Sequence, residues 1–241
     1  MALSAAWLAS VESGVKDARW DQFDIAIKSE VTAYNVRFAS TAGFSPVNWL
    51  LFKAMLWTES GGPDHPSRAW AGRVMQIGNP GDPAYDVLRA GGEGSSLIMP
   101  ADLKTLLAKD DNINRPEVNV RAAIAYLYTR MAQYGTHSVI SLSAVCPAPT
   151  YTVVAHDSFD RIAKKVGTTV ENLLANNKVK PTALRPGMVL TYDPARMERY
   201  ITGWRKFQTA IVADRYNGGG DAEYSAKLSH VMTKVFNRLV R

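Results

Sequence analysis

The sequence predicts a mainly α-helical fold with a small βααβ unit inserted into it. Apolar residues recur at three-to-four spacing before residue 145 and again after residue 195, which is typical of packed helices. A proline-containing stretch at 143–149 interrupts this pattern and is followed by short strand-like and helical runs. We therefore expect a helical domain in two segments, 1–145 and 195–241, with a compact unit at 150–193 between them.

Four helices are expected in the first segment after an amphipathic N-terminal one, at 20–38, 45–59, 100–109 and 118–134, with no long strand-like alternation. The helix at 45–59 has the clearest limits. Ser45 fits an N-cap, Pro46 fits the first helical position, and Gly61 follows the end.

Residues 61–99 are rich in Gly, Pro, Asp and Ser and predict a long functional loop. After residue 195 the helical pattern continues to a break at 217–220, and a last helix is expected at 222–240.

The inserted unit begins with a strand at Tyr151. A helix starts at 156–158 and ends at Gly167, Thr168-Thr-Val-Glu171 forms a capping box for a second helix, and 187–192 predicts a closing strand.

Composition limits the classes of partner. The formal net charge of +6 predicts attraction to polyanions, but the basic residues are spread along the chain and no nucleic-acid motif occurs, so no nucleic acid is expected. No apolar run is long enough to span a membrane. The single Cys146 excludes an internal disulfide, and with four scattered histidines it predicts no metal and no cofactor.

Glu59 is the most informative residue. It continues the apolar stripe of Leu51 and Met55 at i, i+4, i+8 spacing, so its carboxyl faces the buried side at the end of a helix. Burying a carboxylate costs free energy unless the group is paired or functional. An ion pair with Arg73 is the structural alternative. A carboxyl in an apolar pocket is suited to general acid catalysis because its pKa is raised.

Residues 150–193 resemble a LysM module. Tyr151-Thr-Val, His156-Asp157-Ser158-Phe159, Gly167-Thr168, Asn176-Asn177, Leu184-Arg-Pro-Gly187 and Val189-Leu190 stand at the family's spacings, with His156 where a glycine is usual. The resemblance implies binding of N-acetylglucosamine chains by Asp157, Ser158 and Phe159 on one side of a groove and by Asn177 to Lys180 on the other. For Asp157 and Ser158, a simple helix-capping role is equally open.

The flanking segments resemble the soluble lytic transglycosylase (SLT domain) and goose-type lysozyme family, glycoside hydrolase family 23-like, whose catalytic domain is a lysozyme-like α-helical fold. Its motifs occur in order: Glu59-Ser60, Met75-Gln76-Ile77, Asn119-Val-Arg-Ala-Ala-Ile-Ala-Tyr126-Leu127 and Tyr216-Asn217-Gly218-Gly219. Ser67 stands where the family often has a serine. The sequence departs from the family at Trp70, Arg73 and Ala123, where glycines are usual.

This resemblance implies a peptidoglycan lytic transglycosylase that forms 1,6-anhydromuramic ends, with Glu59 as general acid and then base. The implied substrate-binding residues are Ser67, Met75, Gln76, Tyr216 and Asn217. A hydrolase would use a second carboxylate, and Asp64, Asp82, Asp86 and Glu93 are the loop candidates for a muramidase. The glycine departures leave a third alternative, a catalytically inactive peptidoglycan-binding protein.

The expected partners are peptidoglycan glycan strands. The N-terminus lacks the charged region of a signal peptide, so we expect synthesis in the cytoplasm and action at the bacterial cell wall, in the periplasm, after non-classical delivery. A phage lysin, an antibacterial effector with an immunity protein and a delivery machine, and an ordinary wall-remodelling enzyme all remain open.

Overall fold

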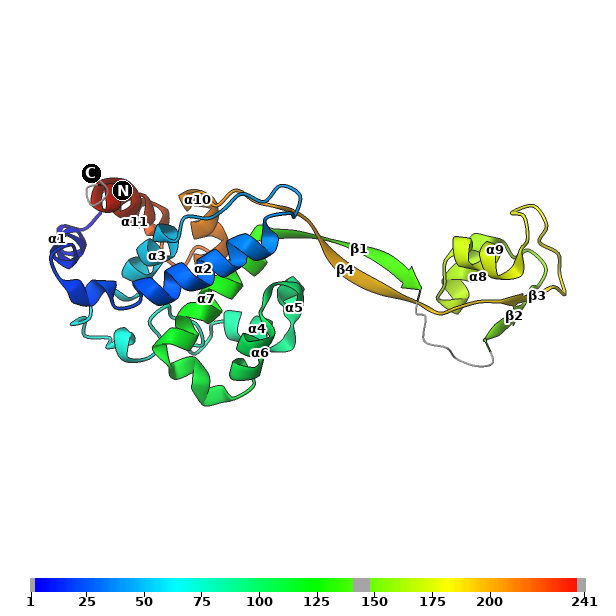
Figure 1. Ribbon diagram of the computed structural model, residues 1–241, viewed down its shortest axis with the longest axis horizontal. Coiled ribbons are helices and arrows are strands. Elements are labelled where there is room, and N and C mark those ends of the chain that lie inside the picture. The colour runs from blue at the N-terminus through cyan, green and yellow to red at the C-terminus, as the bar shows by residue number, and fades with distance from the viewer. Residues whose placement is uncertain (1–2, 141–147, 238–241) are drawn as a thin grey trace. The chain divides into compact units, whose positions relative to one another are not determined.

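The computed structural model describes residues 3–140 and 148–237, so Cys146 and most of the expected linker lie outside the described residues. Two compact units are present: residues 1–134 with 201–241, and residues 135–200. The first, called the helical unit below, is thus formed by two separate parts of the chain (Figure 1).

The helices of the helical unit are α1 (Ala5–Gly14), α2 (Asp24–Phe38), α3 (Leu50–Ser60), α4 (Ala84–Ala90), α5 (Ser95–Ile98), α6 (Ala101–Leu107), α7 (Pro116–Met131), α10 (Thr209–Val212) and α11 (Tyr224–His230). Short 3₁₀ turns lie between several of them, at Ala18–Asp21, Ala69–Ala71, Gly92–Gly94 and Asp110–Asn114. Two π-helical segments follow α10 and α11: η5 (Ala213–Asn217) and η6 (Val231–Phe236).

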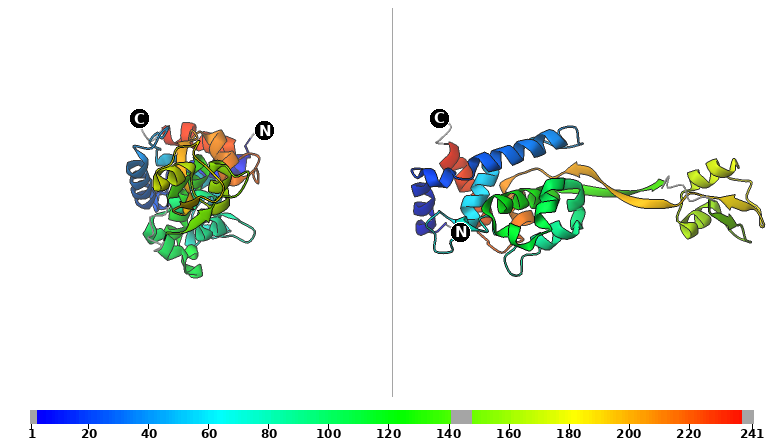
Figure 2. Two further views of the ribbon diagram at one scale, coloured as in Figure 1. Left: turned by 90° about the vertical axis from the view of Figure 1, so that its right-hand side faces the viewer. Right: turned by 60° about the horizontal axis from the view of Figure 1, so that its bottom comes forward.

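One hydrophobic core holds the helical unit together. Helices α2, α4, α5 and α6 pack against α7, while α11 and η6 pack against α3 (Figure 1). The N-terminal α1 also contacts η6, as the right-hand view of Figure 2 shows. Because α3 is covered on several sides, its residues from Leu51 to Trp57 are all buried.

The predicted start of α3 is wrong by about one turn, since the helix begins at Leu50. Asn35 on α2 explains the difference: its side chain accepts a hydrogen bond from the Val47 N–H (2.8 Å) and donates one to the Val47 carbonyl (2.9 Å). These bonds hold Val47 against α2. The predicted end is confirmed, because Gly61 caps the helix with φ +64°.

Two segments expected to be helical are strands. Helix α7 ends at Met131, and β1 (Ala132–Ile140) pairs with β4 (Ala195–Trp204) in a two-stranded sheet. Because β1 and β4 are far apart in the sequence, no pattern of neighbouring residues indicates that they pair. The loop expected at 61–99 is also incorrect in its second half, which folds into α4 and α5.

The expected last helix at 222–240 is α11 followed by η6, and its final residues lie outside the described range.

The second unit contains β2 (Thr150–Thr152), α8 (Phe159–Val166), α9 (Val170–Asn177) and β3 (Val189–Thr191), in the predicted order. Strands β2 and β3 are antiparallel, and the two helices cover a small separate core. Ser158 caps α8 and Gly167 ends it with φ +67°. Thr169, not the predicted Thr168, caps α9.

Within the described residues, no helix combines the length and apolar character needed to cross a lipid bilayer.

Candidate active site

Glu59 lies in the last turn of α3, where the chain leaves the core. Gly62 packs so closely on Trp20 that a Cβ atom there would lie 2.3 Å from the indole ring. The Trp70 indole N–H donates a hydrogen bond to the Gly61 carbonyl (2.9 Å). Trp70 therefore stabilises the turn that follows Glu59.

Burial raises the pKa of Glu59 from its ordinary value of 4.5 to about 7. The Tyr224 hydroxyl, close to the carboxyl but outside ordinary hydrogen-bond geometry, offsets part of this rise. The negative charges of Asp221 and Asp82 increase it further. A carboxyl with this pKa holds a proton at neutral pH about half of the time.

Glu59 has no ion-pair partner within the described ranges 3–140 and 148–237. Arg73, the partner considered from the sequence, instead donates a hydrogen bond to Asn114 (2.8 Å). The Glu59 residue is partly exposed and lines a cavity of about 380 Å³, while its carboxyl is desolvated. That combination is typical of a catalytic acid.

Asn119 on α7 shapes the motif around Gln76. Its side-chain oxygen accepts a hydrogen bond from the Met75 N–H (2.8 Å), and its amide donates to the carbonyl of Ile77 (2.9 Å). Between these fixed neighbours, Gln76 adopts φ +62°, a left-handed conformation unusual for a side-chain-bearing residue. Asn119 is thus a buried residue whose hydrogen bonds fix the backbone on both sides of Gln76.

Tyr216 joins the C-terminal segment to the same motif. Its hydroxyl donates a hydrogen bond to the Met75 carbonyl (3.0 Å), and its ring meets that of Tyr126 edge-on, with centroids 5.9 Å apart. Burial and the nearby Glu59 raise the pKa of Tyr216 well above its usual value, so it stays a neutral donor. Tyr216 lies in the π-helical η5, a type of distortion often found at functional sites.

The other predicted substrate-binding residues are Ser67, Gln76, Asn217 and Met75, and they lie in different surroundings. Ser67 and Gln76 line a cavity of about 320 Å³, where the Ser67 hydroxyl lies 2.9 Å from His65 Nδ1. Asn217 donates a hydrogen bond to the Asp221 carbonyl (3.2 Å) and holds the glycine-rich turn. The expected contact of Met75 with substrate is wrong for its side chain, which is 1% exposed in the core; its backbone positions Tyr216.

Among the candidate second carboxylates, two are engaged elsewhere. Asp64 forms an ion pair with Arg19 (2.6 Å), and Glu93 forms one with Arg130. Asp86 is exposed on α4. Asp82 accepts hydrogen bonds from two backbone N–H groups and is the one loop candidate whose charge acts on Glu59.

Asp221 and Tyr224 are site residues that the sequence did not reveal. Burial acts to raise the pKa of Asp221, but its ion pair with Lys227 (2.7 Å) and the hydrogen bond from the Glu223 N–H together lower the pKa, so Asp221 is ionised. Tyr224 is buried, and its hydroxyl has no hydrogen-bond partner among the described residues. Their position just after the predicted glycine break was the available signal.

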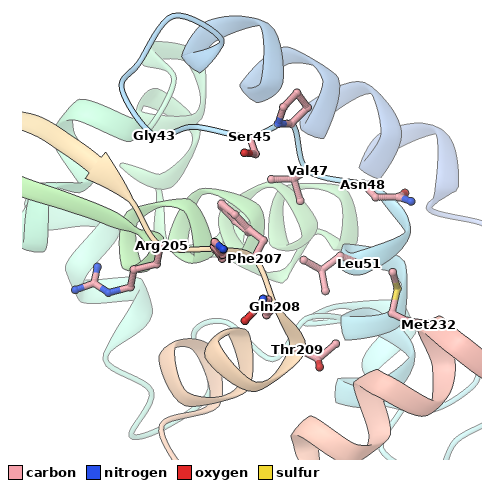
Figure 3. Close-up of a pocket in the computed structure, with 12 residues that line it drawn as sticks. Gly43, Ser45, Val47, Asn48, Leu51, Arg205, Phe207, Gln208, Thr209 and Met232 are labelled. Atoms are coloured by element: carbon pink, nitrogen blue, oxygen red, sulfur yellow. The ribbon is translucent and has the colours of Figure 1, made fainter.

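A cavity of about 540 Å³ lies at the opposite end of α3 (Figure 3). Val47, Leu51, Phe207 and Met232 give it a largely apolar lining. None of the described residues that line it carries a carboxyl or imidazole group, so its size does not make it the centre of acid–base chemistry. In the same described residues, no three His, Cys, Asp or Glu side chains gather as metal ligands.

In the second unit, the residues predicted to bind glycan also make contacts within the unit itself. The Asp157 carboxylate accepts hydrogen bonds from the Tyr151 hydroxyl and the Val154 N–H (both 2.9 Å), and Ser158 caps α8. Phe159 is buried, 7% exposed. Asn177 exchanges two hydrogen bonds with the Thr191 backbone (2.8 Å each), so its side chain ties α9 to β3.

Comparison with known proteins bears on this second unit. Residues 151–192 match the model of the LysM domain family. The chain contains a LysM domain. This LysM domain indicates a role in peptidoglycan binding, and it covers the region that the sequence patterns assigned to an inserted module. No curated protein and no solved structure matches the chain, and no family match supports the resemblance of the helical unit to lytic transglycosylases.

Proposed function

We propose that the helical unit is a peptidoglycan lytic transglycosylase that cleaves the β-1,4 bond between N-acetylmuramic acid and N-acetylglucosamine. The observation that carries the proposal is the convergence of four motifs from distant parts of the chain. Asn119 and Tyr216 bind the backbone around Gln76, and Tyr216 lies close enough to Glu59 for the Glu59 charge to act on its hydroxyl. A core without catalytic function would not require this set of polar residues around a desolvated carboxyl.

In the proposed reaction, the protonated Glu59 donates its proton to the glycosidic oxygen as that bond breaks and positive charge develops at the anomeric carbon. The resulting carboxylate then accepts the proton of the C6 hydroxyl of the same muramic acid residue, whose oxygen bonds to the anomeric carbon. Glu59 ends protonated, and the product is a 1,6-anhydro end. A pKa near 7 suits both steps because neither protonation state is strongly favoured at neutral pH.

Gln76 and Asn217 are proposed to orient the substrate through their amide groups. Gln76 is suited to this because its constrained backbone limits the directions that its side chain can take. The LysM domain is proposed to hold the enzyme on the wall, which raises the local concentration of glycan around the helical unit.

A muramidase is the second candidate, and the charges of Asp82 and Asp221 at Glu59 favour it. Either carboxylate could activate a water molecule in place of the C6 hydroxyl. Mass spectrometry of muropeptides released from purified wall separates the two. Anhydro ends that disappear in the Glu59→Gln variant support the transglycosylase, and reducing ends alone reject it. A folded Glu59→Gln variant that retains wild-type cleavage would reject catalysis by Glu59 altogether.

Action on the wall implies delivery to the periplasm. A phage lysis or tail system and an injected effector with an immunity protein are the proposed routes, with an exported wall-remodelling enzyme as the alternative.

A further inference from the structure

The cavity that contains Glu59 is built jointly by two segments. Helix α1 supplies one wall, including Trp7 and Ser10, and the end of α3 with His65 supplies the other. A second cavity, of about 420 Å³, also opens onto Ser10 and His65 and continues past the Arg19–Asp64 ion pair. Because Ser10 and His65 line both cavities, the two cavities are neighbours along α1, and together they are called the cleft below.

Trp7 is held in place at the Glu59 end of this cleft. Its backbone N–H donates to the Ser4 hydroxyl (3.1 Å), which caps α1. Its ring meets His230 edge-on with centroids 6.0 Å apart, and the Lys227 ammonium lies 5.9 Å from the ring centroid. The residue is nevertheless only partly buried, so part of the ring faces the cavity.

An indole at this place has a definite chemical use. One face of a pyranose ring carries C–H groups with slight positive charge, which pack on the negative face of an aromatic ring, while the hydroxyl and acetamido groups at the ring edge need hydrogen-bonding partners. Ser10 and His65 in the same lining can supply such partners.

We propose that α1 forms a saccharide subsite adjoining Glu59, with Trp7 as the platform on which an N-acetylhexosamine ring of the glycan strand stacks. The subsite rests on the proposed function, because that function identifies the strand as a β-1,4-linked glycan. With this subsite, α1 would help to position the substrate.

The distribution of tryptophan makes a direct test available. The six tryptophans are Trp7, Trp20, Trp49, Trp57, Trp70 and Trp204, and residues 135–200 contain none. In full-length protein labelled with 5-fluorotryptophan, ¹⁹F signals therefore report on the helical unit and not directly on glycan bound to the LysM domain. The Trp7→Phe variant assigns the Trp7 signal, and Trp49, at the other end of α3, is the matched control.

The probe is the β-1,4-linked tetramer of N-acetylglucosamine, added to the full-length Glu59→Gln variant so that it is not cleaved. The Trp7 signal should shift and saturate while the Trp49 signal stays in place. With active enzyme on purified glycan strands, Trp7→Ala should raise KM about tenfold with kcat within about twofold, and Trp7→Phe should restore part of the loss.

An unmoved Trp7 signal, or an unchanged KM in folded Trp7→Ala protein, would overturn the subsite. If the Glu59→Gln variant is inactive and Trp7 does not respond, the subsite fails and the proposed function stands. If Glu59→Gln still cleaves wall while Trp7 responds to the tetramer, the catalytic role of Glu59 fails and glycan binding at α1 stands.

Discussion

Glu59 should make the helical unit less stable as pH rises. In the folded protein its pKa is about 7, whereas an exposed glutamate in the unfolded chain has a pKa of 4.5. Between these values the folded state keeps the proton that the unfolded state has lost, so the free energy of unfolding decreases with rising pH and becomes level above pH 7. Each pH unit of this difference corresponds to about 1.4 kcal/mol, which gives a total of about 3 kcal/mol.

The Glu59→Gln substitution isolates this effect because glutamine cannot ionise. The free energy of unfolding of each protein is measured in urea by tryptophan fluorescence, and the wild-type value is subtracted from that of the variant. This difference should be about 3 kcal/mol larger at pH 8 than at pH 4.5. Fluorescence is suitable because every tryptophan lies in the helical unit. Other titrating groups contribute equally to both proteins and cancel.

The matched control is Glu117→Gln, since Glu117 is exposed on α7. Its difference from wild type should change by less than about 1 kcal/mol between the two pH values, because an exposed carboxylate in the first turn of a helix contributes no more than that. If the Glu59→Gln difference changes by as little, Glu59 is not desolvated and the argument for its acid function is refuted.

Three further predictions follow from the site and the module. Asp221→Asn should lower the pKa of Glu59 by removing a negative charge, so the alkaline fall in wall-clearing rate, measured from pH 5 to 9, should move to lower pH. Asn119→Ala should lower the free energy of unfolding by about 3 kcal/mol or more in urea, because three buried backbone groups lose their partner. Asn177→Ala should speed hydrogen exchange of β3, measured by mass spectrometry, because two hydrogen bonds to that strand are lost.

Exposed positions provide the controls. Asp214→Asn should leave the pH profile in place, and Lys180→Ala should leave exchange in β3 unchanged. A pH profile that Asp221→Asn does not move, a loss below 1 kcal/mol in Asn119→Ala, or unchanged exchange in Asn177→Ala would each contradict the corresponding role.

Local signals predicted most of the secondary structure where neighbouring residues determine it. Ser158 and Gly167 limit α8 as expected, because a cap acts within one turn of its own helix. Ser45 and Pro46 misled for the opposite reason: the distant Asn35 binds the Val47 backbone and outweighs their local preference. Strands β1 and β4 were missed because each depends on a partner far away in the sequence.

The same distinction applies to the functional residues. Glu59 could be singled out because its desolvation is encoded in the apolar stripe of its own helix. Asp221 and Tyr224 belong to no motif beyond their position just after the glycine break at 217–220, and only the fold brings them to Glu59. In the LysM domain, sequence similarity proposed Asn177 as a glycan contact, and the structure adds that its side chain bonds to the Thr191 backbone, which a sequence pattern does not reveal.

The order of residues along the chain also determines when the site can form during synthesis. The ribosome makes Glu59 early, then the whole LysM domain, and only afterwards Tyr216, Asp221 and Tyr224. Until those residues emerge and pack, the Glu59 carboxyl lacks the neighbours that Tyr224 and Asp221 provide in the folded protein. A chain interrupted within the LysM domain would therefore carry Glu59 without part of the surroundings that set its pKa.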